Sequence, residues 1–162
     1  MYDILIIGAG VVGGLIAREL SRYRLRIGIL ERMPDVAMGA TRANSAIVHA
    51  GFDAKPGTLK AKLNVRGNAM MEQVTAELGV NFCRNGSLVV GFREEDRKTL
   101  QQLLERGIEN GVPGLSLLNR EELLALEPNI GDGVCCALLA PTGGIVCPYG
   151  LCLAAVGNAI DN

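Results

Sequence analysis

The stretch Ile4-Leu5-Ile6-Ile7-Gly8-Ala9-Gly10-Val11-Val12-Gly13, close to the start of the chain, decides the fold. Its four consecutive apolar residues are typical of a strand that is covered on both faces, as in a parallel sheet. After the glycines the apolar residues recur at steps of three and four, which predicts a helix with one apolar face: Val11, Val12, Leu15, Ile16, Leu20 and Tyr23. A second strand is predicted at 26–30. Strand, helix and strand in this order form a βαβ unit.

The segment 8–13 has the pattern G-x-G-x-x-G between the first strand and the helix. The first glycine permits a tight turn, the second lets the backbone approach a pyrophosphate, and the third lets the helix pack closely. Glu31 follows Gly13 by 18 residues, where a carboxylate can accept hydrogen bonds from ribose hydroxyls and would repel a 2′-phosphate. The sequence therefore predicts a dinucleotide site that disfavours NADP, and the pattern alone leaves NAD and FAD open.

Composition excludes several other classes of protein. The net charge of −1 over 162 residues argues against a nucleic-acid partner, and a single histidine, His49, excludes sites that need two imidazoles. The five cysteines show no metal-binding spacing, so we expect free, buried thiols and no metal site. The apolar stretch 4–17 is too short to cross a bilayer. We expect a cytoplasmic protein, with peripheral association with a membrane left open.

The rest of the chain alternates helices and short strands. Thr58 is predicted to cap a helix that ends before Gly79, with an apolar stripe of Leu59, Leu63, Met70, Val74 and Leu78. Lys60, Lys62 and Arg66 on another face are either solvated or guide an anionic substrate. Asn85-Gly86 predicts a type I′ hairpin between strands at 80–84 and 87–92. Further helices are expected at 94–110, with a stripe of Leu100, Leu103, Leu104 and Ile108, at 120–126 and at 151–160, and further strands at 115–118, 133–140 and 145–146.

A family resemblance appears after the βαβ unit. Gly-Ala-Thr-Arg-Ala-Asn-Ser-Ala-Ile-Val-His-Ala-Gly-Phe at 39–52, followed by Lys-Pro-Gly-Thr-Leu-Lys-Ala at 55–61, resembles the N-terminal part of FAD-dependent oxidoreductases of the D-amino-acid oxidase type. The nearest branch resembles FAD-dependent glycerol-3-phosphate dehydrogenases and L-2-hydroxyglutarate oxidases. Residues 141–149 match a later family segment, although this chain has Cys147-Pro148 where many members have Asp-Pro.

The resemblance implies an FAD cofactor and assigns roles to residues of this chain. Glu31 would bind the adenine ribose, and His49 would approach the flavin ring with Ala50 and Gly51. His49 is then a catalytic acid/base, a hydrogen-bond donor to flavin, a covalent tether or a structural loop residue. The diphosphate would be held by Gly8, Ala9, Gly10, Val11, Val12 and Gly13, and the flavin side would be lined by Arg32, Thr41, Asn44, Ser45 and Ala46.

The fold class expected is α/β: a partial Rossmann-like FAD-binding domain at 1–79 and 147–162, with a partial α+β substrate domain inserted at 80–146. The last helix should be followed by another strand of the parallel sheet, so we expect the chain to be the N-terminal fragment of a longer enzyme and to be inactive alone.

The expected reaction is oxidation of a small anionic secondary alcohol by hydride transfer to flavin, with sn-glycerol 3-phosphate as the first substrate and L-2-hydroxyglutarate as the alternative. A quinone, oxygen or a redox protein would accept the electrons. A non-catalytic nucleotide-binding module and an NAD-linked dehydrogenase are the competing hypotheses.

Overall fold

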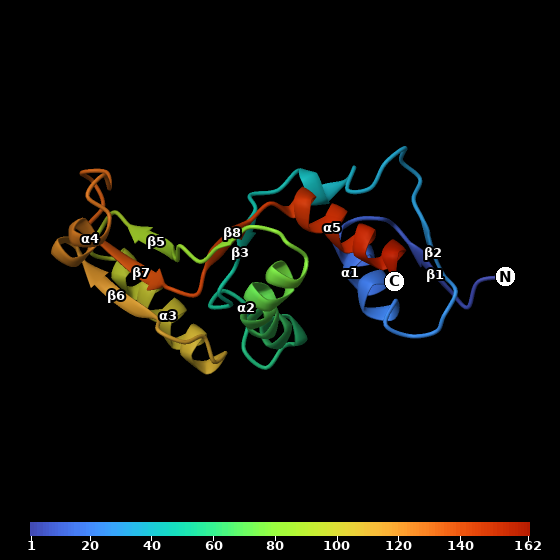
Figure 1. Cartoon of the computed structure of the whole chain (residues 1–162). Coiled ribbons are helices and arrows are strands. Elements are labelled where there is room, and N and C mark those ends of the chain that lie inside the picture. The colour runs from blue at the N-terminus through green and yellow to red at the C-terminus, as the bar shows by residue number, and fades with distance from the viewer. The chain divides into compact units, whose positions relative to one another are not determined.

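The computed structural model describes residues 1–162, which divide into two compact units (Figure 1). The first unit contains Met1–Ile47, Glu72–Phe82 and Val146–Asn162, and the second contains Val48–Met71 and Cys83–Ile145. The expected domains at 1–79 with 147–162 and at 80–146 stay a prediction for the complete protein. Within this chain, residues 48–71 belong to the second compact unit.

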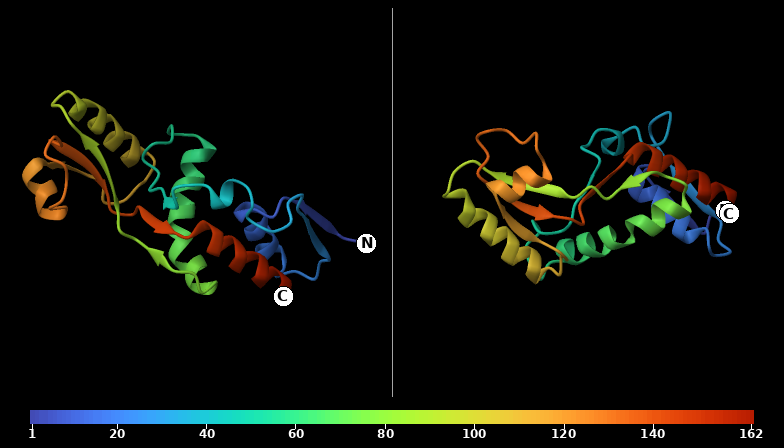
Figure 2. Two further views of the ribbon diagram at one scale, coloured as in Figure 1. Left: turned by 90° about the horizontal axis from the view of Figure 1, so that it is seen from above. Right: turned by 60° about the vertical axis from the view of Figure 1, so that its left-hand side comes forward.

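The first unit contains the expected βαβ arrangement. Strand β1 (Ile4–Ile7) leads into helix α1 (Val11–Leu20), and β2 (Ile27–Leu30) pairs with β1 in parallel, with Ile4 opposite Ile27 and Ile7 opposite Leu30. The last helix, α5 (Pro148–Asp161), lies along α1, as Figures 1 and 2 both show. The α/β fold class with a parallel sheet at the start is thus confirmed.

The buried face of α1 differs from the predicted one. Val12 and Ile16 are 69% and 47% exposed, and Tyr23 lies beyond the end of the helix. The buried residues are instead Gly13, Gly14, Ala17 and Arg18. A Cβ atom on Gly14 would lie 3.0 Å from Cγ2 of Val156 and 3.6 Å from Cβ of Ala155, both on α5. Small residues let the two helices approach closely. Of the predicted stripe, Val11 packs against the cluster that contains Cys152 and Val156, so the apolar periodicity indicated the packed face only in part.

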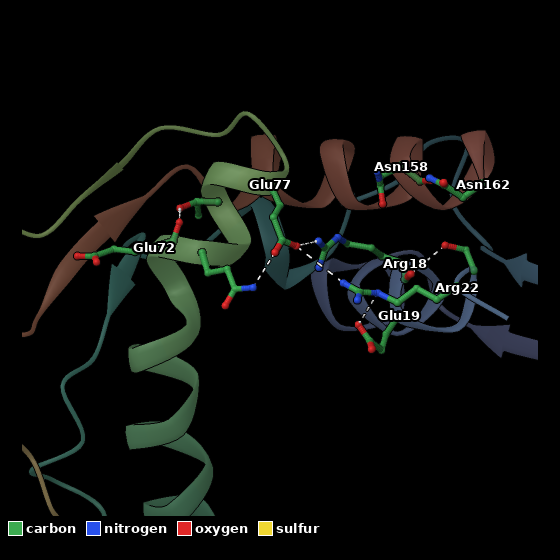
Figure 3. Close-up of polar contacts among 10 residues, drawn as sticks. Arg18, Glu19, Arg22, Glu72, Glu77, Asn158 and Asn162 are labelled. Carbon is green, nitrogen blue, oxygen red and sulfur yellow. Dashed lines mark hydrogen bonds and ion pairs between the residues drawn. The ribbon is translucent and has the colours of Figure 1, made fainter.

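A charged contact links α1 to the end of helix α2 (Leu59–Glu77), as Figure 3 shows. The guanidinium of Arg18, a residue only 9% exposed, donates a hydrogen bond to the Glu77 carboxylate. Arg22 lies 3.8 Å from the same carboxylate, and Gln73 Nε2 donates to it at 2.8 Å. The Gln73 amide, followed by Arg18, lowers the pKa of Glu77. The carboxylate is therefore the partner that allows a charged arginine to be buried on α1.

The second unit is built on an antiparallel sheet with strand order β5 (Ser87–Gly91), β7 (Cys136–Ala140), β6 (Ser116–Asn119). Alternate residues of β7 point to opposite faces. Cys136 and Leu138 pack with Leu100 of helix α3 (Asp96–Glu109), and Ala137 packs with Leu123 of helix α4 (Arg120–Leu126). Each helix therefore covers one face of the sheet.

Several local predictions in this unit are confirmed. Asn119 and Glu122 form a capping box at the start of α4, at distances of 2.8 and 3.0 Å. Thr58 Oγ1 accepts a hydrogen bond from the Ala61 N–H at 3.3 Å. In the first unit, Gly79, after the end of α2, has the predicted left-handed φ, at +64°. The β7 strand begins at Cys136, later than the predicted Gly133.

The predicted hairpin at Asn85-Gly86 is wrong. The short strand β4 (Phe82–Cys83) belongs to a sheet with β3 (Ile47–Val48) and β8 (Gly144–Val146), in the order β3-β8-β4, whereas β5 pairs with β7. A type I′ turn needs positive φ at both central residues, and only Gly86 has it, at +74°. The Gly86 N–H donates to the Gly143 carbonyl at 2.9 Å, so the chain leaves one sheet for another here.

The predicted stripes of α2 and α3 are also partly wrong. Leu59, Leu63 and Met70 are 69%, 52% and 47% exposed, and the buried positions of α2 are Ala61, Asn68 and Thr75. On α3, Ile108 is 61% exposed while its neighbour Gly107 is buried. Gly107 packs so closely that a Cβ on it would lie 2.2 Å from Leu115 Cδ1. The α3 stripe is thus confirmed for Leu100, Leu103 and Leu104, which pack in the core, whereas α2 buries small and polar residues that an apolar pattern does not reveal.

The expectation of buried thiols holds for Cys136 and Cys152 and is wrong for Cys83 and Cys147, which are exposed. Cys147 instead caps α5, its Sγ accepting from the Gly150 N–H at 3.3 Å. No helix of the structure combines the length and the apolar character needed to cross a membrane.

Candidate functional site

The glycine loop needs glycine for two reasons: a left-handed backbone at Gly8, and lack of room for a side chain at Gly10 and Gly13. Gly8 donates its N–H to the Leu30 carbonyl at 2.8 Å, beside the end of β1. Its φ of +100° then turns the chain away from the strand. A Cβ on Gly10 would lie 3.0 Å from Thr41 Oγ1. A Cβ on Gly13 would lie 2.0 Å from the Gly8 carbonyl oxygen, far inside van der Waals contact. Glycine at position 13 is therefore a steric requirement of the strand-to-helix turn.

The N-terminus of α1 offers free backbone donors. Its N-cap is Gly10, which supplies no capping side chain, and the first turn contains no acidic residue. The Val11 N–H donates to Thr41 Oγ1 at 3.0 Å. The first N–H that reaches a carbonyl of its own helix turn is that of Gly14, which donates to Gly10 at 2.9 Å, so the Val12 and Gly13 N–H groups have no partner within the helix. Such unpaired N–H groups and the helix dipole favour an anion at this end.

Glu31 lies directly beside the glycine loop. Its Oε2 accepts a hydrogen bond from the Ala9 N–H at 2.8 Å, and its Oε1 accepts from the Met33 N–H at 2.9 Å. These bonds, led by the one from Ala9, hold the pKa of Glu31 below its ordinary value of 4.5. A carboxylate has lone pairs left after two such bonds, so it can still accept from the hydroxyls of a ribose.

The Glu31 contacts predict a pH-dependent loss of stability. Because the folded pKa is lowered, the carboxylate stabilises the folded chain above pH 4.5, and this contribution is lost as the pH falls through the folded pKa. We expect Glu31→Gln to lower the thermal midpoint at pH 7 and the difference from the parent chain to shrink below pH 4.5. Thermal unfolding followed by circular dichroism measures both. Glu109→Gln, at an exposed position of α3, is the control; an equal effect of the two substitutions would contradict the assignment.

Thr41, in the short 3-10 helix η1 (Ala40–Arg42), belongs to the predicted flavin-side segment. Its Oγ1 accepts the hydrogen bond from the Val11 N–H of the glycine loop. Asn44 folds the segment on itself, since its Nδ2 donates to the carbonyls of Ala40 and Thr41 at 3.0 and 2.8 Å and its Oδ1 accepts from the Ala46 N–H at 2.8 Å. Ala46 has a φ of +62°. Arg32 and Ser45 are exposed.

His49 lies in the second unit, so the structure does not place it relative to the glycine loop. Its side chain is exposed and its carbonyl accepts a hydrogen bond from Asn68 Nδ2 at 3.1 Å. His49 lines a cavity of about 110 Å³ together with Gly51, Phe52, Asp53, Ala54, Lys60 and Asn64. Its role toward flavin stays a prediction.

Sequence reasoning missed two sets of residues around these sites. Asn68 is 6% exposed and connects His49 to Arg84 and to the Thr142 carbonyl. Ala37, with a φ of +59°, donates its N–H to the Ala9 carbonyl at 2.9 Å. Only the asparagine gave a signal, since a polar residue in the middle of a helix between apolar positions needs a partner when it is buried.

Comparison with known proteins gives similarities of three kinds: to a family model, to two curated proteins and to a solved structure. The model of the family "FAD dependent oxidoreductase" matches residues 3–162. The glycerol 3-phosphate dehydrogenase of Caloramator mitchellensis is 52% identical; the match covers 100% of this chain and 34% of that protein. The mitochondrial L-2-hydroxyglutarate dehydrogenase of Dictyostelium discoideum is 40% identical; the match covers 90% of this chain and 33% of that protein. The structure of dithionite-reduced L-alpha-glycerophosphate oxidase from Mycoplasma pneumoniae with FAD bound superposes with a TM-score of 0.93 at 31% identity, covering 99% of this chain and 42% of that one. The chain thus spans about a third of the curated relatives.

Proposed function

Since the chain belongs to the family of FAD dependent oxidoreductases, we propose that it forms the ADP-binding part of an FAD site in an enzyme that oxidises a small anionic secondary alcohol. One observation carries this proposal: the glycine loop, the unpaired N–H groups of α1 and the Glu31 carboxylate lie together in the first unit. This set supplies what an adenosine diphosphate needs, namely close backbone approach, anion donors and a hydroxyl acceptor.

We propose the following roles toward FAD for residues whose chemistry suits the cofactor. Gly8, Ala9, Gly10, Val11, Val12 and Gly13 would surround the diphosphate. Glu31, already charged and fixed by the Ala9 N–H, would accept hydrogen bonds from the adenine ribose. Arg32, Thr41, Asn44, Ser45 and Ala46 would lie on the side toward the flavin. FAD, when bound, would supply the acceptor for a hydride from the substrate carbon, and His49 would take the proton from the substrate hydroxyl.

The substrate we propose is sn-glycerol 3-phosphate, supported by the similarity to the Caloramator dehydrogenase along the whole chain. L-2-Hydroxyglutarate is the second candidate, supported by the similarity to the Dictyostelium enzyme. Both are small anions with a secondary alcohol. The electron acceptor, for which we propose a quinone, oxygen or a redox protein, and the cytoplasmic location stay predictions.

Two measurements test the proposal. FAD added to the 162-residue chain should lose fluorescence saturably, and ADP should compete with it; unchanged flavin fluorescence would contradict an ADP-binding role. In the complete protein without oxygen, glycerol 3-phosphate should bleach the visible flavin absorbance faster than L-2-hydroxyglutarate does. The opposite order would assign the second substrate. We expect no turnover of either compound by the 162-residue chain alone.

A further inference from the structure

The pocket beside His49 has the features of a binding site for a small polar molecule. Its volume of about 110 Å³ exceeds the space that a single water molecule needs. One wall is the segment 49–54, and the other is the first part of α2, with Lys60 and Asn64. All of these residues belong to the second unit, so the pocket is complete within one compact body.

The wall at 49–54 is held in place by side chains from two helices. Four of its carbonyl oxygens accept hydrogen bonds from residues of α2 and α3 or the residue that caps α3: His49 from Asn68 at 3.1 Å, Gly51 and Ala54 from Asn110 at 3.0 and 2.7 Å, and Asp53 from Arg106 at 3.1 Å. Gly51 has a φ of +113°, and a Cβ there would lie 2.7 Å from Val65 Cγ2. The wall is thus fixed before any ligand arrives, as binding pockets usually are.

Because those carbonyls are bonded, few polar groups remain for a ligand. The lining residues that carry polar side chains are His49, Asp53, Lys60 and Asn64. Oδ1 of Asn64 is buried and has no hydrogen-bond partner. An unpaired buried acceptor costs free energy, so a hydroxyl that enters the pocket and draws this amide toward itself removes the cost.

We propose that this pocket binds a small anion that also carries a hydroxyl group, such as a hydroxylated phosphate ester. The anionic group pairs with the Lys60 ammonium, and the hydroxyl donates to Asn64 Oδ1 beside the His49 imidazole. This proposal rests on the proposed function and deepens it, because it names the groups of this chain that select a hydroxy anion.

The proposed ligand carries two groups, and each has a molecule that lacks it. Glycerol has no anionic group to pair with the Lys60 ammonium. Inorganic phosphate has no alcohol group to reach Asn64 Oδ1. These two molecules are therefore the comparisons in the test.

The experiment uses the fact that His49 is the only histidine of the chain, so its imidazole gives a single set of NMR signals. With 13C-labelled histidine in the 162-residue chain, sn-glycerol 3-phosphate should shift the signals saturably. Inorganic phosphate should bind at least about tenfold more weakly because it offers no alcohol group, and glycerol should give no saturable shift. No shift with glycerol 3-phosphate, or equal affinity for glycerol, would overturn the proposal.

Variants then assign the two contacts. Lys60→Met should weaken glycerol 3-phosphate binding by about tenfold or more, since it removes a charge-assisted hydrogen bond at an exposed position without threatening the fold. Lys62→Met is the matched control, because Lys62 lies on the same helix and does not line this pocket. Asn64→Leu should remove the preference for glycerol 3-phosphate over inorganic phosphate. Equal effects of the two lysine substitutions would mean attraction by general charge only and would refute the site.

This test is independent of the flavin. The NMR signals report binding in the second unit with no cofactor present, whereas the fluorescence titration reports the glycine loop in the first unit. FAD binding without a His49 shift would support the proposed ADP-binding function and refute the proposed ligand pocket. A His49 shift without FAD binding would support the ligand pocket and refute the ADP-binding function.

Discussion

Replacing Gly13 with alanine is expected to abolish FAD binding and to destabilise the first unit by about 3 kcal/mol or more. The new Cβ would lie 2.0 Å from the carbonyl oxygen and 3.2 Å from the carbonyl carbon of Gly8, and 3.4 Å from Cγ2 of Ile6. Two of these atoms are backbone and cannot rotate away. The N-terminus of α1 must therefore move off the loop, and the free N–H groups of its first turn move with it.

Gly157→Ala is the matched control for this prediction. It makes the same change in the same unit, inside α5, where the new Cβ would meet no atom within 4 Å. Alanine favours a helix over glycine by about 1 kcal/mol, so this variant should be slightly stabilised. Urea unfolding followed by circular dichroism measures the stabilities, and the FAD fluorescence titration measures binding. A Gly13→Ala chain with the stability and FAD affinity of the parent would refute the steric assignment.

The features predicted correctly are those that short-range chemistry determines. The βαβ unit follows from an apolar run, a glycine loop and a change of period within 30 residues. The capping box of Asn119 and Glu122 depends on two side chains three positions apart, and it lies where the pattern placed it. Cys147 stands where many members of the family resembled have aspartate, and its sulfur accepts the hydrogen bond that caps α5.

The predictions that failed depend on residues far away in the chain. The burial of Gly14 follows from Val156 and Ala155, which no window around α1 contains. Asn85-Gly86 has the composition of a hairpin, but Gly86 bonds to Gly143 and the strands on its two sides join different sheets. In the candidate site, Glu31 was found from its spacing, whereas the Ala37 contact with Ala9 is a loop-to-loop bond with no periodic signal.

Asn68→Ala is expected to cost about 3 kcal/mol of folding free energy, because the side chain of Asn68 makes three partly buried hydrogen bonds. Its Nδ2 donates to the His49 carbonyl at 3.1 Å and to the Thr142 carbonyl at 2.8 Å, and its Oδ1 accepts from Arg84 Nη1 at 3.0 Å. Arg84 still bonds to the Thr142 carbonyl in the variant, so the His49 carbonyl is the group that loses its donor.

The effect should reach His49 as well as the stability. With the Asn68 donor gone, the wall of the pocket at His49 is no longer tied to α2, and the imidazole NMR signals should shift even without ligand. Asn81→Ala, at an exposed asparagine of the first unit, should change neither the unfolding midpoint nor these signals. An Asn68→Ala chain whose stability lies within about 0.5 kcal/mol of the parent would mean that water replaces the lost amide. In that case Asn68 would not be the residue that holds His49 in place.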